Sequence, residues 1–359
     1  MPEKKIVIAA GGTGGHIYPG IALAAELRSR GWDPVFIMRN NDIGKAILDK
    51  AGFAYFAIPS MGFPRRPSLK LCAFPFVLAA GLIKSAALLK TLKPAVVVGM
   101  GGYISFPAVI SAKLLAIPTV IHEQNALPGM TNRLLSRFAD SIALSFEGSK
   151  EYFKSGRAAV TGNPVRKEVF TAEASAARRE FGLAEGKFTV LVFGGSQGAA
   201  GINKAAAASF GFLGDIEGRV QFLHISGQAS YDAVKAQYEK NSIPGTVVAY
   251  THSMGQAYAV SDLIICRAGA TTAAELKILN KPAILIPFPY ATANHQEYNA
   301  RALEKSSGAQ VVLERDITPE VLAGLIIKAF KSAPAGSGLR PPEVFPQERL
   351  ADLVISHIR

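Results

Sequence analysis

Short apolar runs followed by glycines recur along the chain and predict its secondary structure. Residues 4–10 form such a run, the glycine-rich residues 11–16 follow it, and residues 19–30 carry the pattern of a helix. A run of this kind predicts a buried strand, and Pro19 suits the first turn of a helix that is capped by Gly31. The same order of strand, glycine loop and helix is predicted after the apolar runs at 95–98, 188–193 and 263–266.

Strands that alternate with helices predict parallel sheets, because each helix returns the chain to the same edge of the sheet. Two halves that each open with a strand and a glycine loop predict an α/β protein of two doubly wound, Rossmann-like domains. We expect the domains to span 1–162 and 163–342, with a loop at 333–342. The amphipathic segment 343–359 is expected to form a helix that packs back on the first domain. Ligands are expected at the carboxyl ends of the strands, in the cleft between the domains.

Composition narrows the class of protein. The 359 residues are 49% hydrophobic and 18% charged, which is typical of a globular protein of roughly two domains. The formal net charge of +12 indicates anionic partners, without choosing between phosphates, nucleic acid and acidic membranes. Only Cys72 and Cys266 are present, so no disulfide framework is predicted and the cytoplasm is the expected compartment. The apolar run at 6–10 is too short for a signal sequence or an anchor.

Residues 267–275 (RAGATTAAE) have the features of an anion site. They directly follow a predicted strand, and Thr271 and Thr272 stand near the start of the next predicted helix. Backbone N–H groups and the positive end of the helix dipole converge there on a phosphate. Glu275, about one turn further along, is placed to accept hydrogen bonds from both hydroxyls of a ribose. Residues 294–299 add amides and an imidazole of the kind that binds sugar hydroxyls, so the two segments together predict a nucleotide-sugar site.

Spacing argues against other phosphate sites. The glycine loops GGTGGH and GGSQGA lack the G-x-G-x-x-G register of a dinucleotide site, and the predicted strand at 35–38 does not end in an acid. No glycine loop continues into the Gly-Lys-Ser/Thr of a P-loop. The six histidines show no ligand spacing and no two aspartates lie two residues apart, so neither a metal nor a cofactor is expected. Backbone dipoles, Arg166 and Arg267 are then expected to stabilise a leaving diphosphate.

Residues 71–83 are almost wholly apolar and have basic neighbours. This segment of about thirteen residues contains Pro75 and ends at Lys84, whereas a spanning helix needs ~20 apolar residues, so we expect it not to span a membrane. It is either a buried core helix with a solvated basic edge or a patch that rests among lipid headgroups. The residues expected in such a patch are Phe74, Phe76, Leu78, Leu82, Arg65, Arg66, Lys70 and Lys84.

Seven segments, which together span the chain, carry a family resemblance. They are IVIAAGGTGGHIYPG at 6–20, GMGGYIS at 99–105, IHEQNALPGMTNRLL at 121–135, GNPVR at 162–166, FGGSQGA at 193–199, RAGATTAAE at 267–275 and HQEYNA at 295–300. In these segments the chain resembles the MurG family, the N-acetylglucosaminyltransferases of peptidoglycan synthesis. The resemblance implies a GT-B fold and an inverting, metal-independent transfer of GlcNAc from UDP-GlcNAc to the MurNAc 4-hydroxyl of lipid I, giving lipid II. The chain departs from the family pattern at Ala268, where serine is frequent, and at Phe106, where glycine is common.

The resemblance implies donor contacts in both domains. Ser196 suits a phosphate, while Gln296 and Asn299 suit hydroxyls of the GlcNAc ring. Thr251 is expected near the uracil, where a main-chain contact and a plain turn residue fit equally well. With Arg267 added for its charge, the expected UDP-GlcNAc contacts are Thr13, Gly14, Gly15, Asn125, Arg166, Ser196, Thr251, Arg267, Ala270, Thr271, Thr272, Glu275, Gln296 and Asn299.

The acceptor lipid I is also a diphosphate, so glycine loops at helix starts in the first domain are expected to hold it. The expected acceptor contacts are Gly12, Gly14, Gly102, Tyr103 and His122.

An inverting transfer needs a base for the acceptor hydroxyl, and two residues are candidates. His16 comes first, because the positive end of the helix beside it favours a neutral imidazole. Glu123 is the second. Each has a simpler interpretation: His16 as a hydrogen-bond partner of the acceptor or a helix cap, and Glu123 as the residue that orients His16 or Asn125.

Because the polyprenyl chain of the acceptor lies in a membrane, the resemblance implies that the protein acts at the membrane surface. We therefore expect a peripheral protein on the cytoplasmic face of the inner membrane, bound to anionic lipids, with proteins of cell-wall synthesis as further partners. This favours the patch over the core helix for 71–83. The alternative enzyme is a UDP-GlcNAc 2-epimerase of the same fold, which needs no such patch. A nucleic-acid-binding protein is disfavoured, because basic clusters with interleaved aromatic residues are missing outside 63–90.

Overall fold

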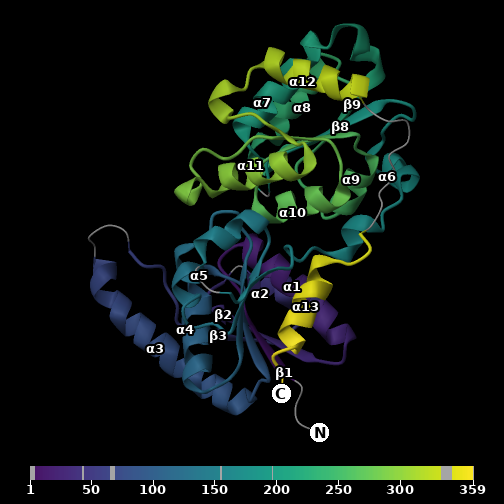
Figure 1. Ribbon diagram of the computed structural model, residues 1–359. Coiled ribbons are helices and arrows are strands. Elements are labelled where there is room, and N and C mark those ends of the chain that lie inside the picture. The colour runs from purple at the N-terminus through teal and green to yellow at the C-terminus, as the bar shows by residue number, and fades with distance from the viewer. Residues whose placement is uncertain are drawn as a thin grey trace. The chain divides into compact units, whose positions relative to one another are not determined.

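The computed structural model describes residues 5–42, 44–64, 69–153, 156–195, 197–332 and 342–358 (Figure 1). Three expected site residues, Ser196, Arg65 and Arg66, lie outside these ranges, as does the side chain of Lys70. The predicted loop at 333–342 lies outside them except for its last residue.

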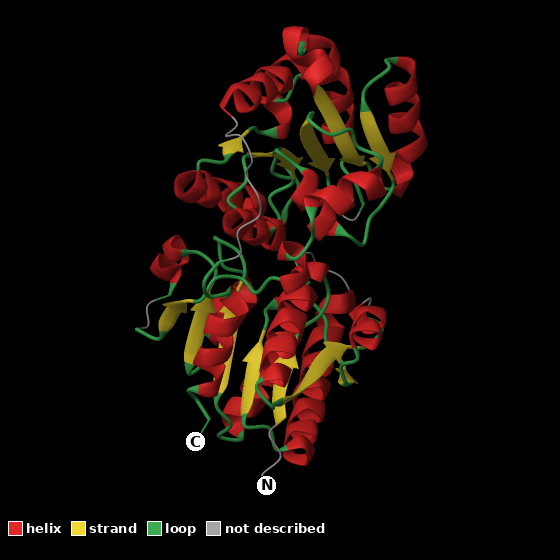
Figure 2. Cartoon of the chain, turned by 90° about the vertical axis from the view of Figure 1, so that its right-hand side faces the viewer, coloured by secondary structure: helices red, strands yellow, loops and turns green. Residues whose placement is uncertain are grey.

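The chain divides into two compact units. The first contains Met1–Arg166 and Glu343–Arg359, and the second contains Lys167–Pro342. Each unit is built on one sheet of parallel strands that lies between helices (Figure 2). The predicted α/β fold of two doubly wound domains is thereby confirmed. The boundary between the two units falls after residue 166, whereas the predicted boundary falls after residue 162.

The first sheet has the strand order β3-β2-β1-β4-β5-β6-β7, and every pair is parallel. The order reverses between β1 and β4, which is where doubly wound sheets bind ligands. Its strands are β1 (Lys5–Ala9), β2 (Asp33–Arg39), β3 (Tyr55–Ile58), β4 (Val96–Gly99), β5 (Thr119–Glu123), β6 (Ser141–Leu144) and β7 (Ala158–Val160). Its helices are α1 (Gly14–Ser29), α2 (Gly44–Ala51), α3 (Leu69–Leu92), α4 (Gly102–Leu114), α5 (Met130–Leu135) and α13 (Pro346–Ile355), with a 3-10 helix at Glu147–Tyr152.

The second sheet has the parallel order β10-β9-β8-β11-β12-β13 and reverses between β8 and β11. Its strands are β8 (Phe188–Phe193), β9 (Val220–Ile225), β10 (Gly245–Val248), β11 (Leu263–Cys266), β12 (Ala283–Leu285) and β13 (Gln310–Val311). Its helices are α6 (Ala174–Phe181), α7 (Ala200–Ser209), α8 (Tyr231–Lys240), α9 (Met254–Val260), α10 (Ala270–Leu279), α11 (His295–Ser307) and α12 (Pro319–Ser332). Short 3-10 helices lie at Lys167–Phe170, Phe210–Phe212, Gly214–Arg219, Gln228–Ser230, Thr292–Asn294 and Glu314–Asp316.

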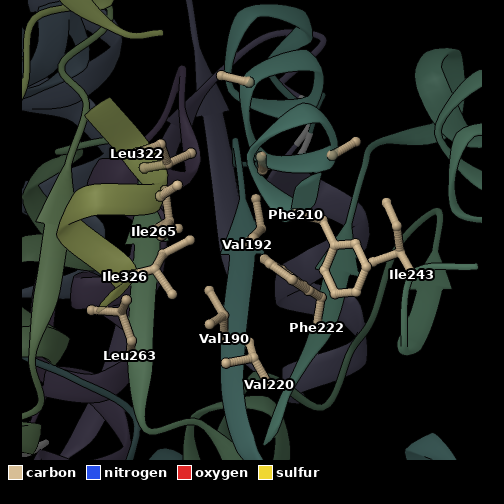
Figure 3. Packing of buried hydrophobic residues seen from close by; sticks show 14 of the residues in the cluster. Val190, Val192, Phe210, Val220, Phe222, Ile243, Leu263, Ile265, Leu322 and Ile326 are labelled. Carbon is tan, nitrogen blue, oxygen red and sulfur yellow. The ribbon is translucent and has the colours of Figure 1, made fainter. Parts of the chain in front are cut away.

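The core of the second unit explains why its strands read as continuous apolar runs. Side chains of β8, β9 and β11 pack beneath α12, whose Leu322 and Ile326 point at the sheet (Figure 3). All six residues of β8 and all six of β9 are buried, because helices cover both faces of a parallel sheet.

Helix α1 begins earlier than predicted. The carbonyl of Thr13 accepts hydrogen bonds from the N–H groups of His16 (3.2 Å) and Ile17 (3.3 Å), so the helix starts at Gly14. Pro19 therefore lies inside the helix instead of opening it. Residues 14–16, predicted as part of a loop, form the first turn, and this brings His16 onto a helix at the carboxyl edge of the sheet.

Helix α13 returns to the first unit as predicted. Leu350, Ala351 and Val354 are fully buried in the core that also contains Leu23 and Leu27 of α1.

Helix α3 is longer than the predicted apolar segment, since it continues past Lys84 to Leu92. Within the part of the chain that the structure describes, α3 is the one helix long and apolar enough to cross a membrane by length and composition, which corrects the argument from a short run. Residues 71–80 include no buried position, whereas Ser85, Leu89 and Leu92 are buried at helical spacing. The second half packs on α4, and the first turns stand clear of the sheet (Figure 1).

Candidate active site

The loop after β1 is held by a buried carboxylate. Asp42 accepts hydrogen bonds from the backbone N–H groups of Gly12 (2.8 Å) and Gly44 (2.9 Å) and forms an ion pair with Arg39 (3.3 Å). A Cβ added to Gly11 would lie 2.8 Å from an oxygen of this carboxylate, so only glycine fits there without a shift. Contacts within the first unit therefore fix the predicted diphosphate loop.

A chain of hydrogen bonds links His16 to the backbone of Gly162. Nδ1 of His16 lies 3.2 Å from Oε1 of Gln124, Nε2 of Gln124 lies 3.0 Å from Nδ1 of His122, and Nε2 of His122 lies 3.0 Å from the carbonyl oxygen of Gly162. Gln124 Nε2 also donates to the carbonyl of Met100 (2.7 Å), which fixes the orientation of the amide.

This chain of bonds assigns the protons of both imidazoles. The carbonyl of Gly162 can only accept, so His122 carries its proton on Nε2 and accepts at Nδ1 from Gln124. Oε1 of Gln124 can also only accept, so Nδ1 of His16 carries a proton, and in the neutral imidazole the lone pair is then on Nε2. That tautomer is the one required of a base that acts through Nε2.

The imidazole of His16 lies against the glycine turn before α4. Gly101 and Gly102 have φ of 86° and 71°, and a Cβ on them would lie 3.2 Å and 3.3 Å from atoms of the His16 ring. The first turn of α1, the start of α4 and the base candidate thus meet at one place. Two further expected contacts border it: Thr13 is exposed before α1, and the guanidinium of Arg166 lies 4.9 Å from the ring centre of Tyr18.

Burial lowers the pKa of His122 from 6.5 to about 4, because a charged imidazole loses its solvation inside the protein. The unfolded chain therefore binds the proton first, so the stabilising contribution of neutral His122 is complete above pH 6.5 and is lost as the pH falls towards 4. We expect denaturant unfolding measured from pH 7.5 to 4.5 to show a smaller loss of stability in His122→Gln than in the unaltered protein. Equal pH dependence would contradict a buried neutral His122.

Glu123 organises the loop that follows β5. One carboxylate oxygen accepts from the backbone N–H (2.9 Å) and side chain (3.3 Å) of Asn125, and the other from the N–H of Gly129 (3.0 Å) and Nδ2 of Asn132 (2.9 Å). The side chain is buried at 2% exposure. These contacts match the simpler of its two predicted roles, that of orienting Asn125.

In the second unit the backbone of the loop after β8 lies in direct contact with the backbone of the loop after β9. A Cβ on Gly198 would lie 2.1 Å from the carbonyl oxygen of Ser226, and Gly198 has a φ of 77°. That carbonyl accepts from Nδ2 of Asn203 (2.8 Å), whose Oδ1 lies 3.0 Å from Nε2 of His224. Burial lowers the pKa of His224 to about 4, so it stays neutral as the hydrogen-bond donor. The hydrogen bonds of Asn203 and His224 therefore fix the backbone against which the predicted phosphate loop packs.

The start of α10 carries the predicted phosphate and ribose groups. Ala270, Thr271 and Thr272 form its first turn, and the hydroxyl of Thr271 is buried without a hydrogen-bond partner within the described residues. Glu275, exposed by only 5%, accepts a hydrogen bond from the hydroxyl of Tyr258 (2.8 Å). A buried hydroxyl at a helix start and an oriented carboxylate one turn later suit a phosphate followed by a ribose.

Arg267 and Asn299 hold the backbone around this helix start. Nη1 of Arg267 pairs with Glu314 (2.8 Å) and donates to the carbonyls of Ile286 and Pro287 (both 3.2 Å). Asn299 is fully buried and donates to the carbonyl of Ala268 (3.1 Å). Both residues are expected to contact the donor, and these hydrogen bonds show that they also hold the loops in place.

The side chains of Gln296 and Thr251 each accept one hydrogen bond from a backbone N–H group. Oε1 of Gln296 accepts from the backbone N–H of Phe288 (3.0 Å), which leaves its amide N–H groups as donors towards a sugar. The hydroxyl of Thr251 accepts from the N–H of Ser253 (3.0 Å) within a turn.

Sequence reasoning missed Asp42, Gln124 and Tyr258 as parts of the site. Gln124 lies inside the segment 121–135 that carries the family resemblance, but Asp42 and Tyr258 come from other elements and carry no signal in the sequence. Among the described residues no group of three or more His, Cys, Asp or Glu side chains is arranged to hold a metal ion.

Family models match most of both units. The glycosyltransferase family 28 N-terminal domain matches residues 6–144, and the glycosyltransferase family 28 C-terminal domain matches residues 189–336. The chain belongs to glycosyltransferase family 28. A relative from Halothermothrix orenii is 41% identical over 331 residues, covering 90% of this chain and 89% of the relative. It is named UDP-N-acetylglucosamine--N-acetylmuramyl-(pentapeptide) pyrophosphoryl-undecaprenol N-acetylglucosamine transferase.

Solved structures agree with membership of family 28. The crystal structure of Acinetobacter baumannii MurG is 28% identical, has a TM-score of 0.75, and the match covers 98% of this chain and 99% of that one. The resemblance to the MurG family is confirmed. A UDP-GlcNAc 2-epimerase from Neisseria meningitidis, bound to UDP-GlcNAc, has a TM-score of 0.67 at 14% identity, over 98% of this chain and 99% of that one. That likeness shows a shared fold alone.

Proposed function

We propose that this protein transfers GlcNAc from UDP-GlcNAc to the 4-hydroxyl of MurNAc in lipid I, with His16 as the base. The observation that carries the mechanism is the tautomer of His16, which Gln124 and His122 orient against the glycine turn at the start of α4. The choice of substrates is supported by the identity with relatives that are named for this transfer.

For the donor, we propose that the start of α10 binds the diphosphate and Glu275 the ribose. The unpartnered Thr271 hydroxyl and the N–H groups of the first turn supply donors to phosphate oxygens. Arg267 and Asn299 act indirectly by holding the backbone on either side of this turn. The amide of Gln296 donates to a hydroxyl of GlcNAc.

For the transfer itself, the acceptor 4-hydroxyl oxygen attacks the anomeric carbon of GlcNAc and its proton passes to Nε2 of His16. The bond between that carbon and the diphosphate oxygen breaks on the opposite face, so the configuration inverts and UDP leaves with the electron pair. Helix dipoles and backbone N–H groups stabilise the charge on the departing diphosphate. Once His16 has taken the proton, the hydrogen bond from its Nδ1–H to Oε1 of Gln124 stabilises the positive charge of the imidazolium.

Product analysis tests this function against that of an epimerase. The protein is incubated with UDP-GlcNAc and a lipid I analogue, and the products are identified by mass spectrometry. We expect a disaccharide on the acceptor together with free UDP. Formation of UDP-ManNAc without glycosylated acceptor would instead identify an epimerase.

Transfer is expected to proceed without a divalent metal, because fixed dipoles and N–H groups are available to the diphosphate and the described residues offer no metal-binding cluster. We expect turnover of a water-soluble acceptor to be unchanged by EDTA and by added magnesium. Loss of turnover in EDTA that magnesium restores would contradict this.

We propose that the exposed face of α3 docks the protein on the cytoplasmic leaflet. Phe76 and Ile83 are 77% and 71% exposed, and Lys84 and Lys90 are exposed on the same helix. The double variant Phe76→Ser/Ile83→Ser should bind more weakly to all liposomes, because it loses apolar burial. The double variant Lys84→Glu/Lys90→Glu should bind more weakly only to anionic liposomes at low salt, where charge attraction contributes.

Lys240→Glu, on an exposed position of the second unit, is the matched control for charge and should bind like the unaltered protein. The docking proposal fails if neither double variant changes flotation with vesicles of phosphatidylglycerol and phosphatidylcholine.

A further inference from the structure

The first unit contains an apolar cavity of about 290 Å³ that the mechanism does not use. Its walls come from the segment after β3, from α3, from the start of α4 and from α5. The lining includes Phe63, Phe74, Leu78, Tyr103, Phe106 and Leu134, and it is almost wholly apolar.

Tyr103 connects this cavity to the predicted acceptor loop. It directly follows Gly102, where a Cβ would lie 3.3 Å from the ring of His16. The Tyr103 ring packs on the opposite wall, since a Cβ on Gly62 would lie 2.5 Å from it. The cavity therefore begins one residue from the turn at which the acceptor diphosphate is expected.

The cavity is also continuous with the exposed half of α3. Phe74 and Leu78 line it, and the ring of Phe74 meets that of Phe63 edge-to-face at 5.2 Å. On the same helix Leu71 and Phe76 are exposed by 43% and 77%. An apolar path thus leads from the acceptor turn, through the cavity, to the surface proposed to lie in the headgroup region.

We propose that this cavity binds the isoprene units of the acceptor lipid that are nearest to its diphosphate. The inference rests on the proposed function, because it takes the acceptor to be a polyprenyl diphosphate. In such a lipid the group bonded to the diphosphate is a hydrocarbon, and the apolar wall starts beside the diphosphate turn. The chain then leaves along α3 towards the bilayer, so the protein takes the proximal isoprenes out of the membrane and burial of their apolar surface contributes to affinity.

The experiment compares two water-soluble acceptors, the farnesyl and the methyl esters of MurNAc-pentapeptide diphosphate, in the absence of membranes. The unaltered protein should have a kcat/KM at least about tenfold higher for the farnesyl ester, as expected for burying a few hydrocarbon groups. Leu134→Trp narrows the cavity and should bring this ratio close to one. Leu114→Trp, the same change on a residue that is 80% exposed and outside the lining, should keep the ratio.

A binding measurement separates this inference from the proposed function. Farnesyl diphosphate, titrated calorimetrically without UDP-GlcNAc, should bind roughly tenfold more weakly to Leu134→Trp than to Leu114→Trp. A thermal unfolding transition like that of the unaltered protein shows that the first unit, which contains both substituted residues, is folded in the variants. If neither ester is glycosylated, the proposed function fails, and the titration still decides what the cavity binds.

Three results would overturn the inference. The first is equal affinity of farnesyl diphosphate for both tryptophan variants. The second is binding of dihexanoyl phosphatidylglycerol in the cavity without binding of farnesyl diphosphate, which would identify a site for phospholipid acyl chains. The third is self-association of the protein that Leu134→Trp abolishes and that farnesyl diphosphate does not inhibit. This would identify the cavity as an interface with a second copy of the chain.

Discussion

His16→Ala is expected to lower kcat by roughly 10²- to 10⁴-fold, the usual contribution of a positioned general base. The affinity for UDP-GlcNAc, measured by calorimetry, should not change, because the side chain of His16 is not among the expected donor contacts. Added imidazole should restore part of the rate.

Two further variants separate a base from a structural histidine. Gln124→Leu removes the acceptor of the His16 Nδ1–H and should reduce kcat by less than His16→Ala does, again without affecting the donor. His357→Ala serves as the matched control, because His357 bonds Ser141 at the opposite edge of the same sheet (2.7 Å). If His16→Ala retains most of the activity, His16 is not the base.

Glu275→Ala is expected to weaken UDP binding at least tenfold, since charge-assisted hydrogen bonds to a ribose contribute ~1.5–3 kcal/mol each. The carboxylate is buried and held by Tyr258, so little ordering is left to occur when the ribose binds. Binding of an acceptor analogue should survive.

A double-mutant cycle identifies the ribose as the partner of Glu275. The unaltered protein should bind 2′,3′-dideoxy-UDP much more weakly than UDP, whereas Glu275→Ala should bind both alike. Glu304→Ala, at a carboxylate on the α11 surface whose ion pair is with Arg301, is the control. If the variant discriminates between the two nucleotides as strongly as the unaltered protein, Glu275 only supports the fold.

The local pattern of apolar residues was sufficient to predict two of the strands that carry the site. The strands 188–193 and 263–266 have the predicted bounds in the structure, because a parallel strand covered on both faces is a continuous apolar run, which ends here at Gly194 and Arg267. The start of α1 was misplaced, because the bonds from the Thr13 carbonyl outweigh the preference of Pro19 for a first turn. The length of α3 was underestimated, because Lys84 is compatible with a helix whose buried face is Ser85, Leu89 and Leu92.

The sequence by itself determined the fold class, the glycine turns and the candidates His16, Glu123 and Glu275, since these depend on spacing along one element. Only the tertiary structure decided the hydrogen-bond partners of each candidate. Glu123 accepts hydrogen bonds from Asn125, Gly129 and Asn132, and His16 is bonded through Nδ1 to Gln124, the arrangement on which its proposed role as base rests. The physical reason is that a polar side chain acts through its partners, and spacing along one element does not give them: those of Glu123 depend on how the loop after β5 folds back, and Gln124 comes to His16 from a strand end that is adjacent in space but 108 residues away in sequence.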